Sequence, residues 1–188
     1  MDRRILHTKR LLRDTLLTML CEKPLEAITP TELCRRATVN RNTFYRYYAK
    51  PLDVLREAED ELVATIKERL QESGDSFENL VSVCEQIKED RLLSEVLLLH
   101  HPDPAYWARI REIAKDQTNS QIDTQTPRND DPPQFSRWVS TYTMAGATAI
   151  IEQWVKDGMR EDPRTVARFI FDMSHHGFHH YNSGHDLQ

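Results

Sequence analysis

Glycine and cysteine are scarce in this 188-residue chain, which has five of the first and three of the second. Cys21, Cys34 and Cys84 are odd in number and fit no zinc spacing, which argues against a disulfide framework. We therefore expect the three cysteines to be small core residues of a protein in a reducing cytoplasm. The chain also lacks an apolar run of about 18 residues, so no membrane span is predicted. Its first ten residues are too charged for a signal peptide.

Motifs of the common enzyme classes are also missing. The sequence has no glycine-rich phosphate loop, no GxSxG and no HExxH, and its carboxylates are spread over predicted helix surfaces. We therefore predict no catalytic residues, no cofactor and no enzymatic activity.

Acidic side chains are few at the start of the chain and dominate the rest. Residues 1–50 contain 11 Lys and Arg against 5 Asp and Glu, whereas residues 51–188 contain 14 against 25. A basic head on an acidic body favours a nucleic-acid-binding end.

Helix signals dominate the whole chain. Sustained alternation of β-branched residues is absent, and apolar residues recur at helical spacing from Leu12 to Leu20. Pro24 ends this first helix. Further helices are predicted over 51–74, 76–89, 91–100, 103–117, 135–158 and from 162 onward, with a loop over 116–134.

Two short helices are predicted between Thr29 and Tyr48. Thr29 can cap the first, Pro30 suits its first position, and Glu32 completes a capping box. Asn40 can cap the second helix only a few residues later. Two short helices joined by about three residues, after a longer one, form a helix-turn-helix unit. Its second helix is the one that enters a DNA major groove.

The stretch TVNRNTFYRYY, residues 38–48, mixes aromatic with basic side chains. Phe44 and Tyr48 share one side of the second helix and can hold it against a core, whereas Asn42 and Arg46 point most nearly the opposite way. Asparagine and arginine carry forked groups that match purine edges. Tyrosine and threonine hydroxyls and Lys50 suit phosphate oxygens. The alternative interpretation is a surface helix with partly covered aromatics.

The segment KPLEAITPTELCRRATVNRNTFYRYYAKPLDVL, residues 23–55, resembles the DNA-binding domain of the tetracycline-repressor (TetR) family of bacterial transcription regulators. It is most similar to a subgroup common in Gram-positive bacteria. Thr38 stands where the family usually has Gly. Pro51 stands where it usually has a phosphate-binding Lys, for which Lys50 is the nearest substitute. The matching positions are Ile28, Thr29, Leu33, Ala37, Val39, Asn40, Arg41, Thr43, Phe44, Tyr45 and Tyr48.

The resemblance implies an all-α fold. Residues 1–50 would form a three-helix helix-turn-helix DNA-binding domain, and residues 51–188 a helical ligand-binding and dimerisation domain. A homodimer would act on a palindromic operator in double-stranded DNA. The DNA contacts expected from the resemblance and from the faces of the second helix are Thr29, Thr31, Asn40, Arg41, Asn42, Thr43, Tyr45, Arg46, Tyr47 and Lys50.

The resemblance also implies that the last two long helices pair with their copies in a four-helix bundle. Small residues between Ala145 and Ala149 allow close helix approach, and large aromatics flank the apolar stripe. The alternative is that both helices complete the core of the monomer. The predicted interface residues are Trp138, Tyr142, Ala145, Ala149, Trp154, Phe169, Ile170 and Met173.

The resulting functional prediction is a ligand-responsive transcriptional regulator, with repression as the expected mode. An unidentified small molecule would bind among the helices of residues 52–180. Candidate pocket residues are His100, Tyr106, Trp107 and Tyr142, although Tyr106 and Trp107 also fit a core. The alternative is a protein-binding adaptor or co-regulator with the same fold and weak DNA binding. Such an adaptor would not need the basic outward face of residues 40–50.

Histidines are concentrated near the end of the sequence. His175 and His179, and likewise His176 and His180, are spaced i, i+4, which can hold a metal ion. Gly177 is expected to interrupt the helix there, so a solvated tail is favoured and no metal is predicted.

Overall fold

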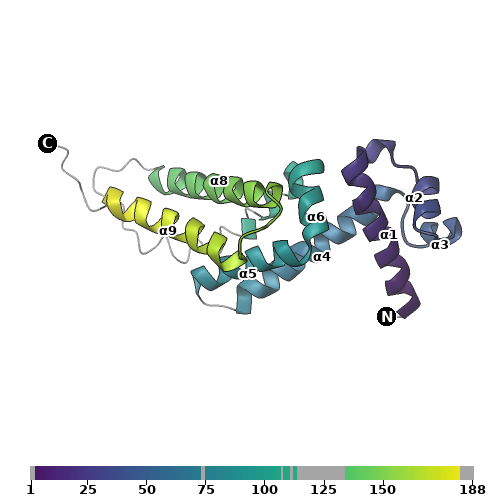
Figure 1. Cartoon of the computed structure of the whole chain (residues 1–188), viewed down its shortest axis with the longest axis horizontal. Helices are drawn as coiled ribbons and strands as arrows, with labels where there is room; N and C mark the ends of the chain where they lie inside the picture. The colour runs from purple at the N-terminus through teal and green to yellow at the C-terminus, as the bar shows by residue number, and fades with distance from the viewer. Residues whose placement is uncertain (1–2, 73–74, 107, 111, 114–133, 183–188) are drawn as a thin grey trace. The chain divides into compact units, whose positions relative to one another are not determined.

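The computed structural model describes residues 3–72, 75–106, 108–110, 112–113 and 134–182, and every regular element within these ranges is a helix (Figure 1). The all-α prediction is confirmed. None of the helices in these ranges has a stretch long and apolar enough to cross a bilayer. The elements are α1 (Arg3–Glu22), the 3₁₀ turn η1 (Leu25–Ala27), α2 (Pro30–Arg36), α3 (Arg41–Tyr45), α4 (Pro51–Glu72), α5 (Ser76–Glu89), α6 (Arg91–Glu95), the π-helical stretch η2 (Val96–His100), α8 (Phe135–Lys156) and α9 (Pro163–Asn182).

The described residues divide into two compact units. The first contains the residues up to Thr65 together with Asp90–Tyr106, and the second contains Ile66–Glu89 and the described residues after position 107. This division differs from the predicted boundary at residue 50, because α6 and η2 pack against α1 in the first unit. The predicted boundary concerns function, and it stays a prediction.

The core of the first unit is built on the apolar face of α1 that the sequence predicted. Leu12, Leu16 and Met19 have no exposed surface. The Arg13 guanidinium pairs with Asp90, which ties α1 to the residue that precedes α6. Further fully or almost fully buried side chains come from α2, α3 and α4, namely Leu33, Phe44, Val54 and Leu55.

Both predicted helix caps are confirmed. The Thr29 hydroxyl oxygen accepts a hydrogen bond from the Glu32 backbone N–H at 3.2 Å, and Pro30 is the first residue of α2. The Asn40 side-chain oxygen accepts a hydrogen bond from the Asn42 backbone N–H at 2.8 Å, and α3 begins at the next residue, Arg41. Because each cap satisfies a backbone N–H that the helix leaves unpaired, the two caps fix where the turn between the helices lies.

The turn after α2 places Thr38 in the left-handed conformation, with a φ of 55°. The Val39 N–H donates to the Cys34 carbonyl at 2.9 Å, and the Thr38 N–H donates to the Arg35 carbonyl at 3.4 Å. These two bonds form a Schellman motif, which usually has glycine at this position. A β-branched residue is strained at such a φ.

In the second unit both α5 and α8 pack against α9. The Arg164 guanidinium forms an ion pair with Glu78 and lies 5.1 Å from the Phe77 ring centroid. The Arg168 guanidinium lies 5.2 Å from the same centroid. Phe77 also meets Phe171 edge to face, with ring centroids 5.5 Å apart. The contact between α5 and α9 therefore combines aromatic, cation–π and ionic terms.

Three local predictions need correction. Gly177 does not interrupt the last helix, because α9 continues to Asn182; a helical glycine costs only about 1 kcal/mol relative to alanine. Cys21 is exposed, whereas Cys34 and Cys84 are buried as predicted. Residues 91–100 form α6 followed by the π-helical η2 instead of one α-helix. Most of the predicted loop over 116–134 lies outside the described residues.

Replacing Thr38 with glycine should stabilise the protein. A non-glycine residue in the left-handed region costs about 1–2 kcal/mol, and the greater chain entropy of unfolded glycine offsets about 0.5–1 kcal/mol of the gain. We expect a net increase of about 0.5–1 kcal/mol in the free energy of urea unfolding. Thr38→Ala, which keeps a Cβ, is the matched control. A Thr38→Gly protein no more stable than Thr38→Ala would show that the turn is unstrained.

Candidate nucleic-acid interface

Two aromatic side chains attach α3 to the core of the first unit. Phe44 has no exposed surface and Tyr48 is 6% exposed, with their ring centroids 5.8 Å apart. Although α3 ends at Tyr45, the Tyr48 N–H still donates to the Phe44 carbonyl at 2.9 Å. Both rings therefore lie on the inner side of one continuous turn, as the sequence predicted.

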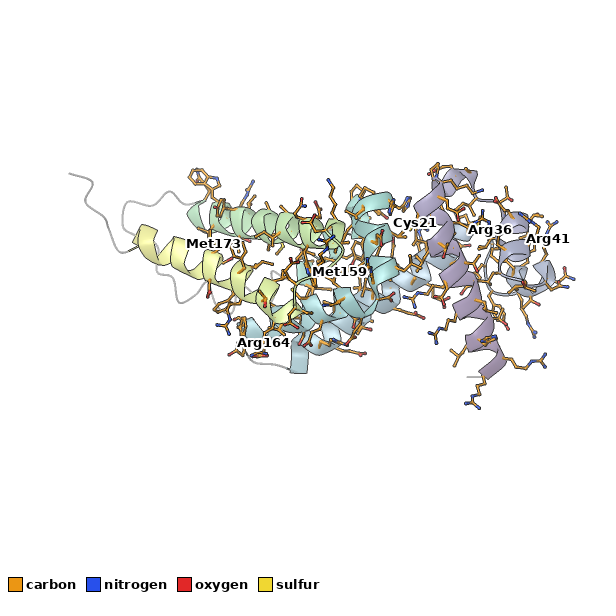
Figure 2. The ribbon with its side chains drawn as sticks, in the orientation of Figure 1. Cys21, Arg36, Arg41, Met159, Arg164 and Met173 are labelled. Atoms are coloured by element: carbon orange, nitrogen blue, oxygen red, sulfur yellow. The ribbon has the colours of Figure 1, made fainter. Side chains whose placement is uncertain are left out.

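The ten side chains predicted to contact DNA lie on the outside of the same unit. Thr43 and Tyr47 are half-buried, and the others are exposed. Arg41 lies at the start of α3, with its guanidinium 5.8 Å from the Tyr45 ring centroid (Figure 2). The structure thus exposes forked, hydroxyl and cationic groups on α3, at the start of α2 and in the segment that follows α3.

Basic side chains in this unit fall into two groups. Arg36 pairs with Glu22 at 2.7 Å, and Lys23 pairs with Glu32 at 2.5 Å, so the acids of α1 and α2 neutralise them. Within the described ranges, Arg41, Arg46 and Lys50 form no ion pair with a carboxylate. The cations of the recognition segment, residues 40–50, are therefore free to meet phosphates or bases.

One cluster beneath the recognition segment was not predicted from the sequence. The carboxylate of Glu57 on α4 accepts hydrogen bonds from the Tyr48 hydroxyl and from Lys9 Nζ on α1. Burial, reinforced by Glu57, raises the pKa of Tyr48 well above its usual value. Burial acts to raise the pKa of Glu57 as well, but the bonds from Lys9 and Tyr48 hold it below its usual value. Lys9 and Glu57 are 48 positions apart, so no local pattern announces the contact.

The predicted dimer residues divide into exposed and buried sets. Trp138 is 56% exposed and Tyr142 is 73% exposed, while Trp154 and Ile170 are each only 4% exposed. Trp154 and Ile170 therefore lie inside the second unit, which agrees with the alternative that they complete the core of the monomer. The exposed predicted residues are Trp138, Tyr142, Ala145, Ala149, Phe169 and Met173, of which Met173 is labelled in Figure 2.

The four predicted effector-pocket residues do not share one unit. His100 is exposed and Tyr106 is buried, and both belong to the first unit. Tyr142 is exposed on α8 of the second unit, and Trp107 falls outside the described residues. The pocket stays a prediction. Within the part of the chain that the structure describes, no group of three or more His, Cys, Asp or Glu could hold a metal ion, and the side chains of residues 175–182 lie outside that part.

Comparison with known proteins defines the class. The family model described as "Transcriptional regulator C-terminal region", of the TetR type, matches residues 74–176. The chain therefore belongs to the TetR family of transcriptional regulators, as the helix-turn-helix residues predicted. None of the curated proteins gives a significant match to the sequence.

Solved structures of the same class share its fold. A TetR transcriptional regulator from Streptococcus agalactiae is 20% identical, with a TM-score of 0.66 over 92% of this chain and 96% of that one. The fatty acid degradation regulator FadR from Bacillus halodurans is 15% identical, with a TM-score of 0.64 over 89% and 94%. FadR from Bacillus subtilis, in complex with stearoyl-CoA, is 16% identical, with a TM-score of 0.61 over 88% and 96%.

Proposed function

We propose that this regulator is a homodimeric, ligand-responsive repressor that binds a palindromic DNA operator. The observation that carries the proposal is the pairing of a buried anchor, Phe44 and Tyr48, with exposed Asn42 and Arg46 on the opposite side of the same turn. A protein that bound only other proteins would have no need of unpaired cations on this segment. In a dimer, two recognition segments would enter successive major grooves about 34–36 Å apart.

Individual side chains of the recognition segment, and Thr29 at the start of α2, are assigned different roles. Asn42 and Arg46 read bases, because their forked groups match purine edges and they lie opposite the anchor. Lys50, Tyr47 and Thr29 contact phosphates, because they lie at helix ends and beside the base-reading face. Base contacts specify sequence, whereas phosphate contacts position the protein without distinguishing sequences.

The exposed stripe on α8 supports dimerisation. Trp138, Tyr142, Ala145 and Ala149 follow i, i+4, i+7, i+11 spacing, which places them on one face of the helix. Phe169 on α9 adds a further large apolar side chain that is more than half exposed. Exposed aromatics of this size usually mark an interface, and the alanines allow close approach of a second helix.

Two buried polar atoms support the proposal that a small-molecule effector binds in the second unit. Trp154 is buried, and neither its indole N–H nor the buried Thr143 hydroxyl has a hydrogen-bond partner among the described residues. An unpaired buried donor costs about 1–3 kcal/mol, which a ligand carrying an acceptor would recover. Because the similar Bacillus subtilis FadR holds stearoyl-CoA, long-chain acyl-CoA is the first class to test, by thermal shift and by release of bound DNA.

Arg46→Ala and Lys50→Ala should weaken DNA binding in different ways. Arg46→Ala should cost about 1–3 kcal/mol on the operator and relax the preference at one or two base pairs of each half-site. Lys50→Ala should weaken all DNA about equally and reduce the slope of log affinity against log salt by roughly one unit per half-site. Binding to a library of operator variants at several salt concentrations separates the two. A uniform loss for Arg46→Ala with altered base preference for Lys50→Ala would reverse the assignment of faces.

Ala149→Glu should dissociate the dimer. The substitution places an unpaired carboxylate in the middle of the α8 stripe, where burial in the partner's surface is strongly unfavourable. Sedimentation should show a shift to monomer, with operator binding lost. Arg137→Glu, exposed on α8 but outside the stripe, is the control and should remain dimeric. A stable dimer of Ala149→Glu would exclude this face as the interface.

A further inference from the structure

Two carboxylates on α4 hold the segment that follows α3. Asp53 Oδ2 accepts hydrogen bonds from the backbone N–H groups of Ala49 at 2.9 Å and Lys50 at 3.0 Å. Glu57, one helical turn further along α4, accepts from the Tyr48 hydroxyl. Three successive residues of the recognition segment, Tyr48, Ala49 and Lys50, are therefore attached to α4 by hydrogen bonds.

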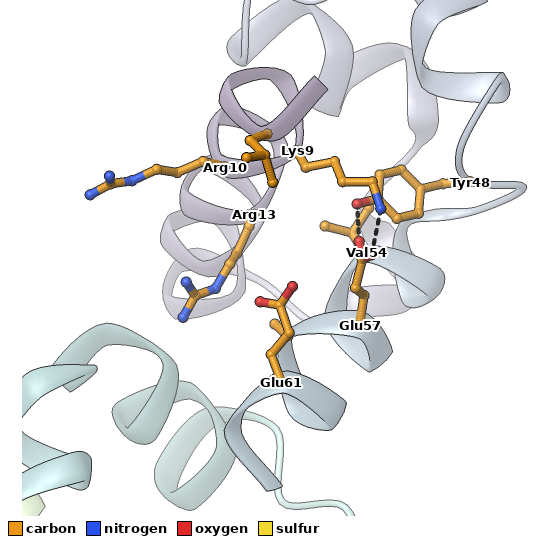
Figure 3. A pocket seen from close by; sticks show the side chains of 9 residues that line it. Lys9, Arg10, Arg13, Tyr48, Val54, Glu57 and Glu61 are labelled. Carbon is orange, nitrogen blue, oxygen red and sulfur yellow. Dashed lines mark hydrogen bonds and ion pairs between the residues drawn. The ribbon is translucent and has the colours of Figure 1, made fainter. Parts of the chain in front are cut away.

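The Glu57 carboxylate also joins α1 to this arrangement. Lys9 Nζ lies 2.5 Å from Glu57 Oε1, and 5.5 Å and 5.8 Å from the ring centroids of Tyr48 and Tyr47. Figure 3 shows Lys9 directed toward Tyr48 and Glu57, while Arg10 points away from them. Lys9, Arg10, Tyr48 and Glu57 line a groove of about 340 Å³ between α1 and α4. One carboxylate thus connects α1, α4 and the recognition segment.

Phe44 alone does not define the orientation of α3. Burial of the Phe44 and Tyr48 rings holds α3 against the unit, but apolar burial is non-directional and does not by itself fix the angle of the helix. Side chains that read bases must be held to within about 0.5 Å. The bond from the Tyr48 hydroxyl to Glu57 supplies a second fixed point on the same turn. Lys9 holds that carboxylate in place and at the same time packs beside Tyr47, which is proposed to contact a phosphate.

We propose that Glu57 is a positioning residue for DNA recognition, which acts through Tyr48 and Lys9 to fix how α3 and Tyr47 meet the duplex. This inference rests on the proposed function. Glu57 itself does not touch DNA. Its charge alone opposes binding to a polyanion, so removing it would strengthen DNA affinity if electrostatics were its only effect. A positioning role predicts the opposite sign.

Glu57→Gln and Tyr48→Phe test the proposal, with Glu61→Gln as the matched control. Glu61 lies one turn further along α4 and lines the same groove, and its carboxylate forms no ion pair with any described residue. The probes are a duplex that the wild-type protein selects from a randomised library, and a non-specific duplex of the same length. Glu57→Gln and Tyr48→Phe should each weaken binding to the selected duplex about tenfold. Both should weaken binding to the non-specific duplex much less, because most phosphate contacts are kept. Glu61→Gln should weaken binding to neither duplex.

The double variant distinguishes a shared contact from two separate effects. Because Glu57→Gln and Tyr48→Phe disturb the same contact, together they should cost little more than either alone. Circular dichroism checks that each variant folds, and Tyr48→Phe, which removes a single hydroxyl, carries the test if Glu57→Gln does not fold. Selected-duplex affinity for Glu57→Gln equal to that of Glu61→Gln, or fully additive losses, would overturn the inference. Failure of the wild-type protein to select any sequence would instead overturn the proposed function.

Discussion

Phe44 is buried without any exposed surface, and the helix that carries it, α3, has only five residues. A helix of that length is not stable alone in water, so its existence depends on packing. Burial of a phenylalanine side chain contributes about 1.5–3 kcal/mol toward holding this helix against the unit. The opposite face is then left to polar and cationic side chains, and the proposed DNA recognition follows from that division.

Charge in the first unit is arranged so that acidic side chains serve the scaffold. Glu22 pairs with Arg36, and Glu32 pairs with Lys23. Asp53 and Glu57 accept hydrogen bonds from the end of the recognition segment. The recognition segment itself keeps its cations unpaired within the described residues. A chain with a net charge of −5 can therefore present a locally basic surface, and the proposed binding to DNA should depend strongly on salt.

Local signals in the sequence predicted the helices well. The Thr29–Pro30–Glu32 cap and the Asn40 cap placed α2 and α3, because capping depends on neighbouring residues only. The predicted helix over 76–89 has the bounds of α5. The left-handed conformation of Thr38 was not predicted, since a threonine gives no local signal for a positive φ; the resemblance showed only that the family usually has Gly at this position.

Contacts between distant residues were beyond local patterns. Lys9 and Glu57 meet because α1 and α4 lie side by side along their groove, which no spacing rule encodes. Trp154 and Ile170 were predicted at an interface but are buried in the monomer, because periodicity gives an apolar face without saying what covers it. Helix continuation through Gly177 likewise depends on a small free-energy balance that composition does not reveal.

The most direct test of the central claim is dimethyl sulfate footprinting of the wild-type protein on a duplex that it selects. The reagent methylates guanine N7 in the major groove and adenine N3 in the minor groove, so it reports which groove the protein fills. Entry of α3 into successive major grooves predicts protection of guanine N7 in two clusters whose centres are about 10 base pairs apart. Protection confined to adenine N3, or a single protected cluster, would contradict the account.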